Sequence, residues 1–159
     1  MKKLFLLDAM ALIYRAHFAF QKTPRISSKG LNTSAVFGFA NTLLEILAKE
    51  KPTHLGVAFD TPTPTFRHVQ FEAYKAQRQE QPEDITVAIP YVKRLLEAMN
   101  IPILLMEGYE ADDIIATLAA RARDAGGTVT IISSDKDLMQ LVGDGVDMLD
   151  PMKNKRIGL

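Results

Sequence analysis

The 159-residue sequence contains no cysteine, no tryptophan and no excess of charge, since 19 Lys and Arg residues balance 19 Asp and Glu residues. The lack of cysteine excludes disulfides, a thiolate nucleophile and cysteine-ligated zinc, so any metal must be held by oxygen or histidine. Apolar stretches such as residues 101–106 fall far short of the roughly 20 residues that span a bilayer. A net charge of zero gives no overall field that would attract a polyanion.

The amino terminus begins like a signal peptide, with two lysines before the apolar residues 4–7. Asp8 interrupts this apolar run, Arg15 follows, and there is no small-residue cleavage site. We therefore predict a soluble, cytoplasmic protein with no membrane partner.

The balanced charge is unevenly distributed along the chain. Residues 1–80 carry 11 basic against 6 acidic residues, whereas residues 81–159 carry 8 against 13. A basic half suits phosphate binding and an acidic half suits metal binding.

Short apolar runs alternate with segments of helical period. The predicted strands are residues 4–7, 55–59, 103–105, 129–132 and 146–149. The predicted helices are residues 9–20, 33–51, 82–100, 111–125 and 136–142. This alternation, with nearly continuously apolar strands, predicts an α/β fold with a parallel central sheet and helices on both faces. Residues 156–159 look like the start of another strand, so we expect the chain to be a fragment.

Acidic residues follow four of the predicted strands. They are Asp8; Asp60; Glu110, Asp112 and Asp113; and Asp135 and Asp137. In an open parallel sheet the ligand crevice lies outside the carboxyl ends of the strands, so we expect these side chains to share one edge. A single Asp after a strand is usually a helix cap, and acids in a first helical turn favour the helix dipole. Their joint occurrence at four strand ends is what indicates a site.

Seven gathered carboxylates would repel one another unless a cation neutralised them. Oxygen ligands without cysteine point to Mg²⁺ or Mn²⁺, and two such ions about 4 Å apart would suit phosphodiester hydrolysis. Asp112 is turned about 200° from Glu110 on an ideal helix, so it converges only at the very start of the helix or in a distorted turn.

A basic segment lies between the second predicted strand and the following helix. Lys75 and Arg78, three residues apart, could reach one phosphate, with Tyr74 available to stack on a base and Arg67 nearby. Without the acidic cluster nearby, a solvated helix face would be the favoured interpretation of this segment. Tyr14 and Arg15, about two turns after Asp8, are candidates for a core and a surface position.

Five short motifs carry a resemblance to a known family. They are residues 6–8 with 14–16, residues 58–60 with 66–68, residues 74–78, residues 108–113 and residues 134–138. In this order and spacing the sequence resembles the 5′-nuclease family, in particular the 5′→3′ exonuclease domains of bacterial DNA polymerases I, over essentially all 159 residues.

The resemblance implies one PIN-like (resolvase-like) domain over residues 1–159 that cleaves DNA at 5′ ends and flaps in replication and repair. It implies a first Mg²⁺ site at Asp8, Asp60, Glu110 and Asp112, and a second at Asp112, Asp135 and Asp137, with Asp113 outside them; Mn²⁺ is an expected substitute. It implies catalytic roles for Lys75 and Arg78 at the base of an arch over residues 61–81. It implies DNA contacts from Tyr14, Arg15, Arg67, Tyr74, Lys75, Arg78 and Lys136. It further implies the bacterial cytosol or nucleoid and, in some members, a polymerase domain in the same chain.

The family continues into a helix–hairpin–helix region with further aspartates of the second metal site, and this region is absent here. We therefore expect the chain to bind the first metal better than the second and to cleave weakly or not at all. The alternatives are a non-catalytic DNA-binding half-domain and a PIN-type ribonuclease. A Toprim-like nuclease would have a glutamate where this chain has Asp8, and a haloacid dehalogenase-type phosphatase would have an aspartate where it has Met10. Both departures argue against these two classes.

Overall fold

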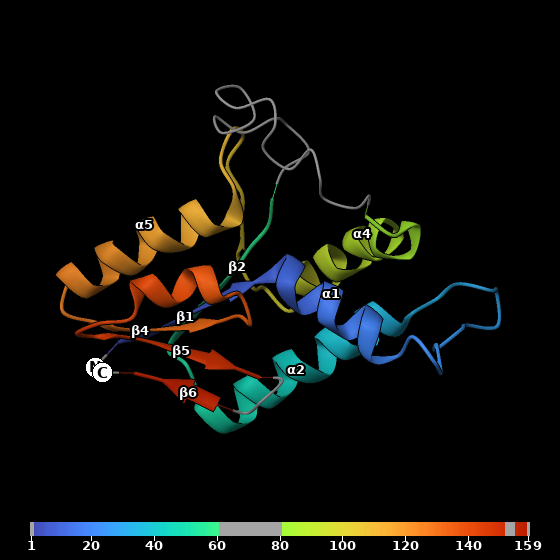
Figure 1. Ribbon diagram of the computed structural model, residues 1–159, viewed down its shortest axis with the longest axis horizontal. Coiled ribbons are helices and arrows are strands. Elements are labelled where there is room, and N and C mark those ends of the chain that lie inside the picture. Colours follow the sequence, from blue (N-terminus) through green and yellow to red (C-terminus); the bar gives the residue numbers. More distant parts are fainter. Residues whose placement is uncertain (1, 61–80, 152–154, 159) are drawn as a thin grey trace.

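The computed structural model describes residues 2–60, 81–151 and 155–158. Its strands form one six-stranded sheet flanked by helices (Figure 1). The strands are β1 (Lys3–Asp8), β2 (His54–Ala58), β3 (Ile103–Leu104), β4 (Thr128–Ile132), β5 (Val146–Asp150) and β6 (Lys155–Ile157). The helices are α1 (Ala9–Ala19), α2 (Ser34–Glu50), α4 (Glu83–Ala98), α5 (Ala111–Asp124) and the 3₁₀ helix η1 (Lys136–Leu141).

The strand order is β3-β2-β1-β4-β5-β6, and β1 to β5 are all parallel. The predicted α/β fold with helices on both faces is therefore confirmed. The last strand differs from the rest of the sheet because β6 pairs antiparallel with β5. Only four residues separate these two strands, too few for the crossover connection that a parallel neighbour requires.

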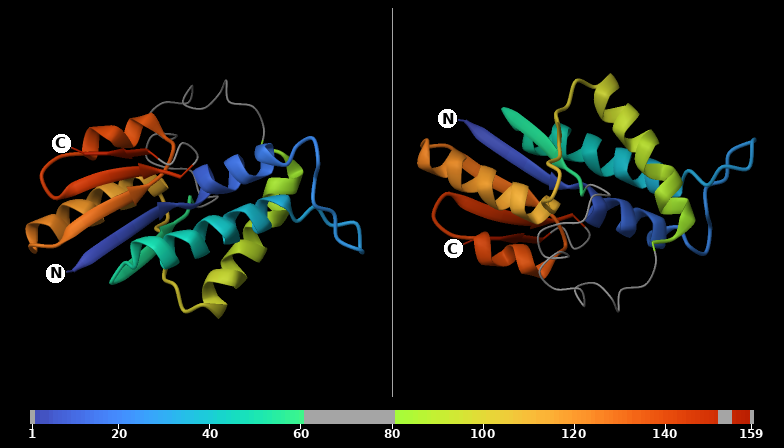
Figure 2. Two further views of the ribbon diagram at one scale, coloured as in Figure 1. Left: turned by 90° about the horizontal axis from the view of Figure 1, so that it is seen from below. Right: turned by 90° about the horizontal axis from the view of Figure 1, so that it is seen from above.

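The sheet separates two hydrophobic cores. The helices α1, α2 and α4 cover one face, and α5 with η1 covers the other (Figure 2). Successive residues of the central strand β1 serve both sides, since Leu6 packs with Ile115 of α5, and Leu7 belongs to the same core as Phe39 of α2. This alternation explains why the strand is apolar at consecutive positions and why β1 delivers Asp8 to the middle of the sheet edge.

A close approach of α1 and α2 depends on Gly38. A Cβ atom at this position would lie 2.5 Å from the Cβ of Ala16. The absence of a side chain therefore allows the two helices to pack together, and this packing supports α1, the helix that Asp8 caps.

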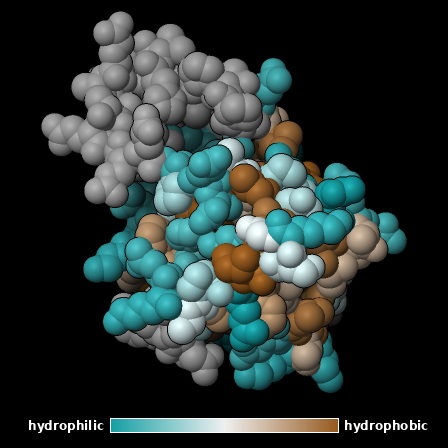
Figure 3. Space-filling view, turned by 90° about the vertical axis from the view of Figure 1, so that its right-hand side faces the viewer, coloured by the Kyte–Doolittle hydropathy of each residue, from teal (hydrophilic) through white to brown (hydrophobic). Residues whose placement is uncertain are grey.

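The connection between α1 and α2 carries part of the positive charge of the first half of the chain. The guanidinium of Arg25 lies 4.4 Å from the ring centre of Phe37 and 5.5 Å from that of Phe20. The backbone N–H of Arg25 donates to Ser34 Oγ at 2.8 Å. On this side of the molecule, hydrophobic residues are interspersed with hydrophilic ones (Figure 3).

Most predicted elements agree with the structure, and two differ in detail. Strand β3 has only two residues, and the short helix after Asp135 is a 3₁₀ helix that ends at Leu141. The expected arch over residues 61–81 lies outside the described residues except for Gln81. Among the described helices, none has the length and apolar character needed to cross a membrane.

Candidate metal centre

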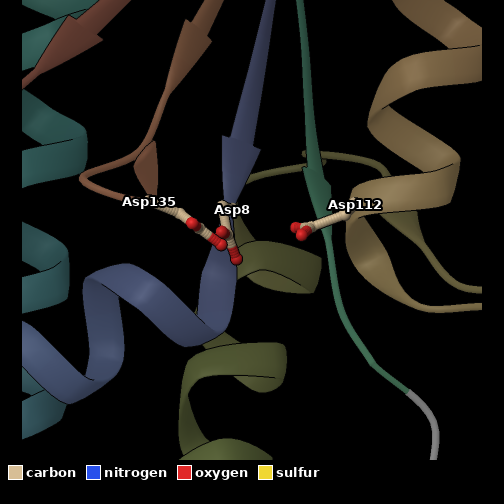
Figure 4. Close-up of side chains that lie close together, drawn as sticks. All are labelled: Asp8, Asp112 and Asp135. Carbon is tan, nitrogen blue, oxygen red and sulfur yellow. The ribbon is translucent and has the colours of Figure 1, made fainter. Parts of the chain in front are cut away.

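Three carboxylates from distant parts of the chain meet at the carboxyl end of the sheet. Asp8, Asp112 and Asp135 each contribute a carboxylate oxygen, and these oxygens lie within 4.8 Å of one another. Figure 4 shows the Asp8 and Asp135 side chains close together after β1 and β4, with Asp112 directed toward them from α5. The predicted sheet-edge location is thus observed for these three residues.

Asp8 is a helix cap as well as a member of this cluster. It is the last residue of β1 and the N-cap of α1, and it is only 5% exposed. Its Oδ1 accepts the backbone N–H of Ala11 at 3.4 Å, and its Oδ2 accepts the hydroxyl of Ser133 at 3.1 Å. The capping role and membership of the acidic cluster are therefore compatible in a single side chain.

The first turn of α5 separates three acids that are adjacent in sequence. Glu110 is the N-cap and is buried, while the Asp113 carboxylate accepts the Glu110 backbone N–H at 3.1 Å in a capping box. Asp112 is the second residue of the helix, and its side chain joins Asp8 and Asp135. Its place at the very start of the helix meets the condition under which convergence was expected.

Asp60 follows β2 and is tied to the same helix. Its Oδ1 accepts the backbone N–H of Ala111, the first residue of α5, at 2.7 Å. This N–H has no partner within the helix, so the carboxylate satisfies it from outside. Asp60 therefore lies beside the cluster, and its side chain is exposed.

Asp135 is positioned by a short hydrogen-bonded turn after β4. Its Oδ1 accepts the backbone N–H of Asp137 at 2.9 Å, which makes Asp135 the N-cap of η1. Its own backbone N–H donates to Ser133 Oγ at 3.0 Å. Sequence reasoning missed Ser133, although a serine two residues before an Asp that caps a helix is a recognisable turn pattern.

The carboxylates of the cluster raise each other's proton affinity. The pKa of Asp8 is raised to about 6, chiefly by burial and also by the charges of Asp60 and Asp135. Hydrogen bonds from Ala11 and Ser133 oppose this increase.

The pKa of Asp112 is raised to about 7 by burial and then by the charge of Asp8. Asp135, Asp60 and Glu110 raise it further in the same direction. The site thus concentrates negative charge that protons or a cation can neutralise.

A groove of about 460 Å³ adjoins the cluster between α5 and η1. Its polar lining residues are Glu110, Asp112, Asp113, Lys136, Asp137 and Gln140. Asp113 and Asp137 therefore lie along the groove next to the three convergent carboxylates, and Lys136 supplies a positive charge among them.

The candidate DNA contacts on α1 have other neighbours in the structure. The Tyr14 hydroxyl donates to Gln81 Oε1 at 3.3 Å, beside the expected arch. Burial lowers the pKa of the half-buried Arg15, and the charges of Asp150 and Glu45 oppose this effect. The remaining expected contacts, Arg67, Tyr74, Lys75 and Arg78, lie outside the described residues.

A family profile and individual relatives match nearly the whole chain. The profile of a family described as the N-terminal resolvase-like domain of 5′-3′ exonucleases matches residues 3–158. The chain is 47% identical over 148 residues to DNA polymerase I of Treponema pallidum, and the alignment covers 93% of this chain and 15% of that protein. It is 42% identical over 155 residues to the 5′-3′ exonuclease of Aquifex aeolicus, and this alignment covers 98% of this chain and 53% of that protein. The chain thus spans about half the length, or less, of these relatives.

A solved structure has the same fold. The flap endonuclease of bacteriophage T5, in a pseudo-enzyme-product complex with DNA and metal ions, has a TM-score of 0.70 and 19% identity, over 99% of this chain and 58% of that one. This likeness concerns the architecture, and it confirms the predicted PIN-like fold.

Proposed function

Because the chain belongs to the family of N-terminal resolvase-like domains of 5′-3′ exonucleases, we propose that it carries a metal-dependent nuclease site for DNA 5′ ends and flaps. The observation that carries this proposal is the convergence of Asp8, Asp112 and Asp135 at the end of a parallel sheet. Three segments far apart in sequence contribute one carboxylate each. Local helix capping alone would not require these carboxylates to converge.

The donor set fits a hard divalent cation. The oxygens belong to carboxylates, and the raised pKa values of Asp8 and Asp112 reflect burial and mutual repulsion that a cation would relieve. Carboxylate oxygens are the protein ligands that Mg²⁺ and Mn²⁺ prefer. We therefore propose Mg²⁺ as the metal, with Mn²⁺ as a substitute.

The proposed ligands form two overlapping sets. Asp8, Asp60, Glu110 and Asp112 would hold the first ion, and Asp112, Asp135 and Asp137 the second, with Asp113 supporting α5 outside both. The assignment of Asp60 and Glu110 is supported by their influence on the pKa of Asp112. The assignment of Asp137 is supported by its position on the groove beside Asp112.

Two divalent cations in such a site supply the positive charge that stabilises the attacking and leaving oxygens of a phosphodiester. The protein's own contribution is to hold the carboxylates and to bind the DNA backbone. For the latter we propose Lys75 and Arg78 as phosphate-steering residues, with Tyr74, Arg67, Lys136, Tyr14 and Arg15 as further DNA contacts and residues 61–81 as the arch. The basic character of residues 1–80 supports this division.

The relatives bear two names, DNA polymerase I and 5′-3′ exonuclease. We propose DNA replication and repair as the setting, as part of a longer protein with or without a polymerase domain. Since the chain spans about half of the exonuclease relative, we expect the chain alone to cleave weakly.

Metal binding tests the site directly. Calorimetric titration of the chain with Mn²⁺ at pH 8 should show binding, and the Asp112→Asn substitution should abolish it. Asp144→Asn is the matched control because Asp144 is exposed and precedes β5, at the opposite edge of the sheet. Equal affinity in the wild type and the Asp112→Asn variant would contradict the proposed centre.

Cleavage tests the function. The chain would be extended by the remainder of the Aquifex aeolicus exonuclease and assayed on 5′-flap DNA with Mg²⁺ or Mn²⁺. We expect flap release that is lost in Asp135→Ala. An extended chain that released no product, or an Asp135→Ala variant as active as its parent, would refute the proposed activity.

A further inference from the structure

We propose that Ser133 is a positioning residue of the metal centre, which holds the Asp8 carboxylate and the Asp135 backbone in the arrangement that binds the cation. This inference rests on the proposed function and adds to it a residue that is not itself a ligand. Ser133 directly follows β4 and is completely buried.

The hydrogen bonds of Ser133 have a fixed direction. The backbone N–H of Asp135 can only donate, so Ser133 Oγ accepts it at 3.0 Å. The single hydroxyl proton of Ser133 is then directed to Oδ2 of Asp8 at 3.1 Å. The hydroxyl therefore links the residue after β1 to the turn after β4 in one chain of polarised hydrogen bonds.

Only one of these two contacts follows from local structure. A serine that accepts the N–H two residues later is a common turn, and it would form without any metal site. The contact with Asp8 joins residues 125 positions apart and is buried. It orients one oxygen of a carboxylate that belongs to the convergent cluster, which the turn alone does not need.

Removal of the Ser133 hydroxyl would remove two hydrogen bonds that involve residues of the acidic cluster. Without it, the buried Oδ2 of Asp8 loses its hydrogen-bond donor, and the Asp135 N–H loses its acceptor. From the residues that the structure describes, Asp8 then retains the long hydrogen bond of 3.4 Å from the Ala11 backbone N–H. Partners that orient metal-ligating carboxylates typically contribute about 10- to 100-fold in metal affinity.

The test compares Mn²⁺ affinity in matched variants of the chain, measured by calorimetry at pH 8. Ser133→Ala removes the hydroxyl, and we expect about 10- to 100-fold weaker binding. Ser133→Thr retains the hydroxyl and should restore binding, whereas Ser133→Val, which has the shape of threonine without the hydroxyl, should not. Ser134→Ala is the control because Ser134 is the exposed neighbour.

Thermal unfolding of each variant in EDTA separates folding from metal binding. If valine and threonine bound Mn²⁺ equally, or if alanine bound as tightly as wild type while Asp112→Asn lost binding, the role of Ser133 would be overturned and the metal centre would stand. If Asp112→Asn also kept wild-type affinity, the proposed centre itself would be overturned, and the inference with it.

Discussion

The carboxylate of Asp60 accepts a 2.7 Å hydrogen bond from the backbone N–H of Ala111, which lies 51 positions later in the chain. This contact fastens the first turn of α5 to the end of β2. Since the same turn carries Asp112, the contact also fixes the distance between α5 and the carboxyl end of the sheet. One carboxylate thus supports the fold and is a proposed metal ligand.

Substitutions at Asp60 should separate these two roles. Asp60→Asn retains an oxygen that can accept the Ala111 N–H, so we expect stability near that of the wild type but weaker Mn²⁺ binding, because the negative charge is lost. Asp60→Ala loses both and should also reduce the free energy of unfolding by about 1 kcal/mol. Urea denaturation and Mn²⁺ titration measure the two effects. An Asn variant with unchanged metal affinity would argue against Asp60 as a ligand.

The stability of the metal-free chain should fall as pH rises from about 4 to about 7. The pKa of Asp8 is raised from 3.8 to about 6 and that of Asp112 to about 7, so the folded state binds more protons than the unfolded state in this window. The slope of unfolding free energy against pH is therefore negative. For Asp8 alone the change is at most about 3 kcal/mol.

Denaturation in EDTA at pH 4.5, 6 and 8 measures this slope. The difference between wild type and the double variant Asp8→Asn, Asp112→Asn cancels the titration of other groups. If the difference in unfolding free energy between the two proteins stayed constant with pH, burial and mutual repulsion would not raise the pKa values of these two carboxylates.

Asp112→Asn should stabilise the metal-free chain and remove its response to Mg²⁺. At pH 8 the uncharged amide avoids repulsion by Asp8 and Asp135, a gain of about 1–2 kcal/mol after allowance for partial exposure. Wild type should instead gain about 1.4 kcal/mol for each tenfold excess of Mg²⁺ over its dissociation constant. Thermal melts with and without Mg²⁺ report both effects, with Asp144→Asn as the control. A variant that still responded to Mg²⁺ would refute the prediction.

Gly38→Ala should destabilise the protein by about 1–3 kcal/mol, since its Cβ would lie 2.5 Å from that of Ala16 and force α1 and α2 apart. Gly143→Ala is the control, because no atom lies within 4 Å of a Cβ at that position and its φ is not positive. Urea denaturation compares the two. Equal stabilities would mean that the helix pair adjusts freely.

Much of the fold was predictable because it depends on local patterns. Apolar runs such as residues 129–132 and the helical period of residues 33–51 are readable along the chain, and they indicated the α/β class. The antiparallel direction of β6 was not foreseen, because it depends on the short connection from β5 and not on the apolar pattern of the strand itself.

That acids follow four strands can be read directly from the sequence, and the geometry of parallel strands predicts that they share an edge of the sheet. Which of these acids converge depends on the packing of helices and strands that lie far apart in the chain. Asp112 joins Asp8 and Asp135, whereas Asp113, the next residue, turns back to the Glu110 N–H. The role of Ser133 depends on a contact with a residue 125 positions away. Strand order and helix rotation arise from packing between distant segments, and these set which carboxylates meet.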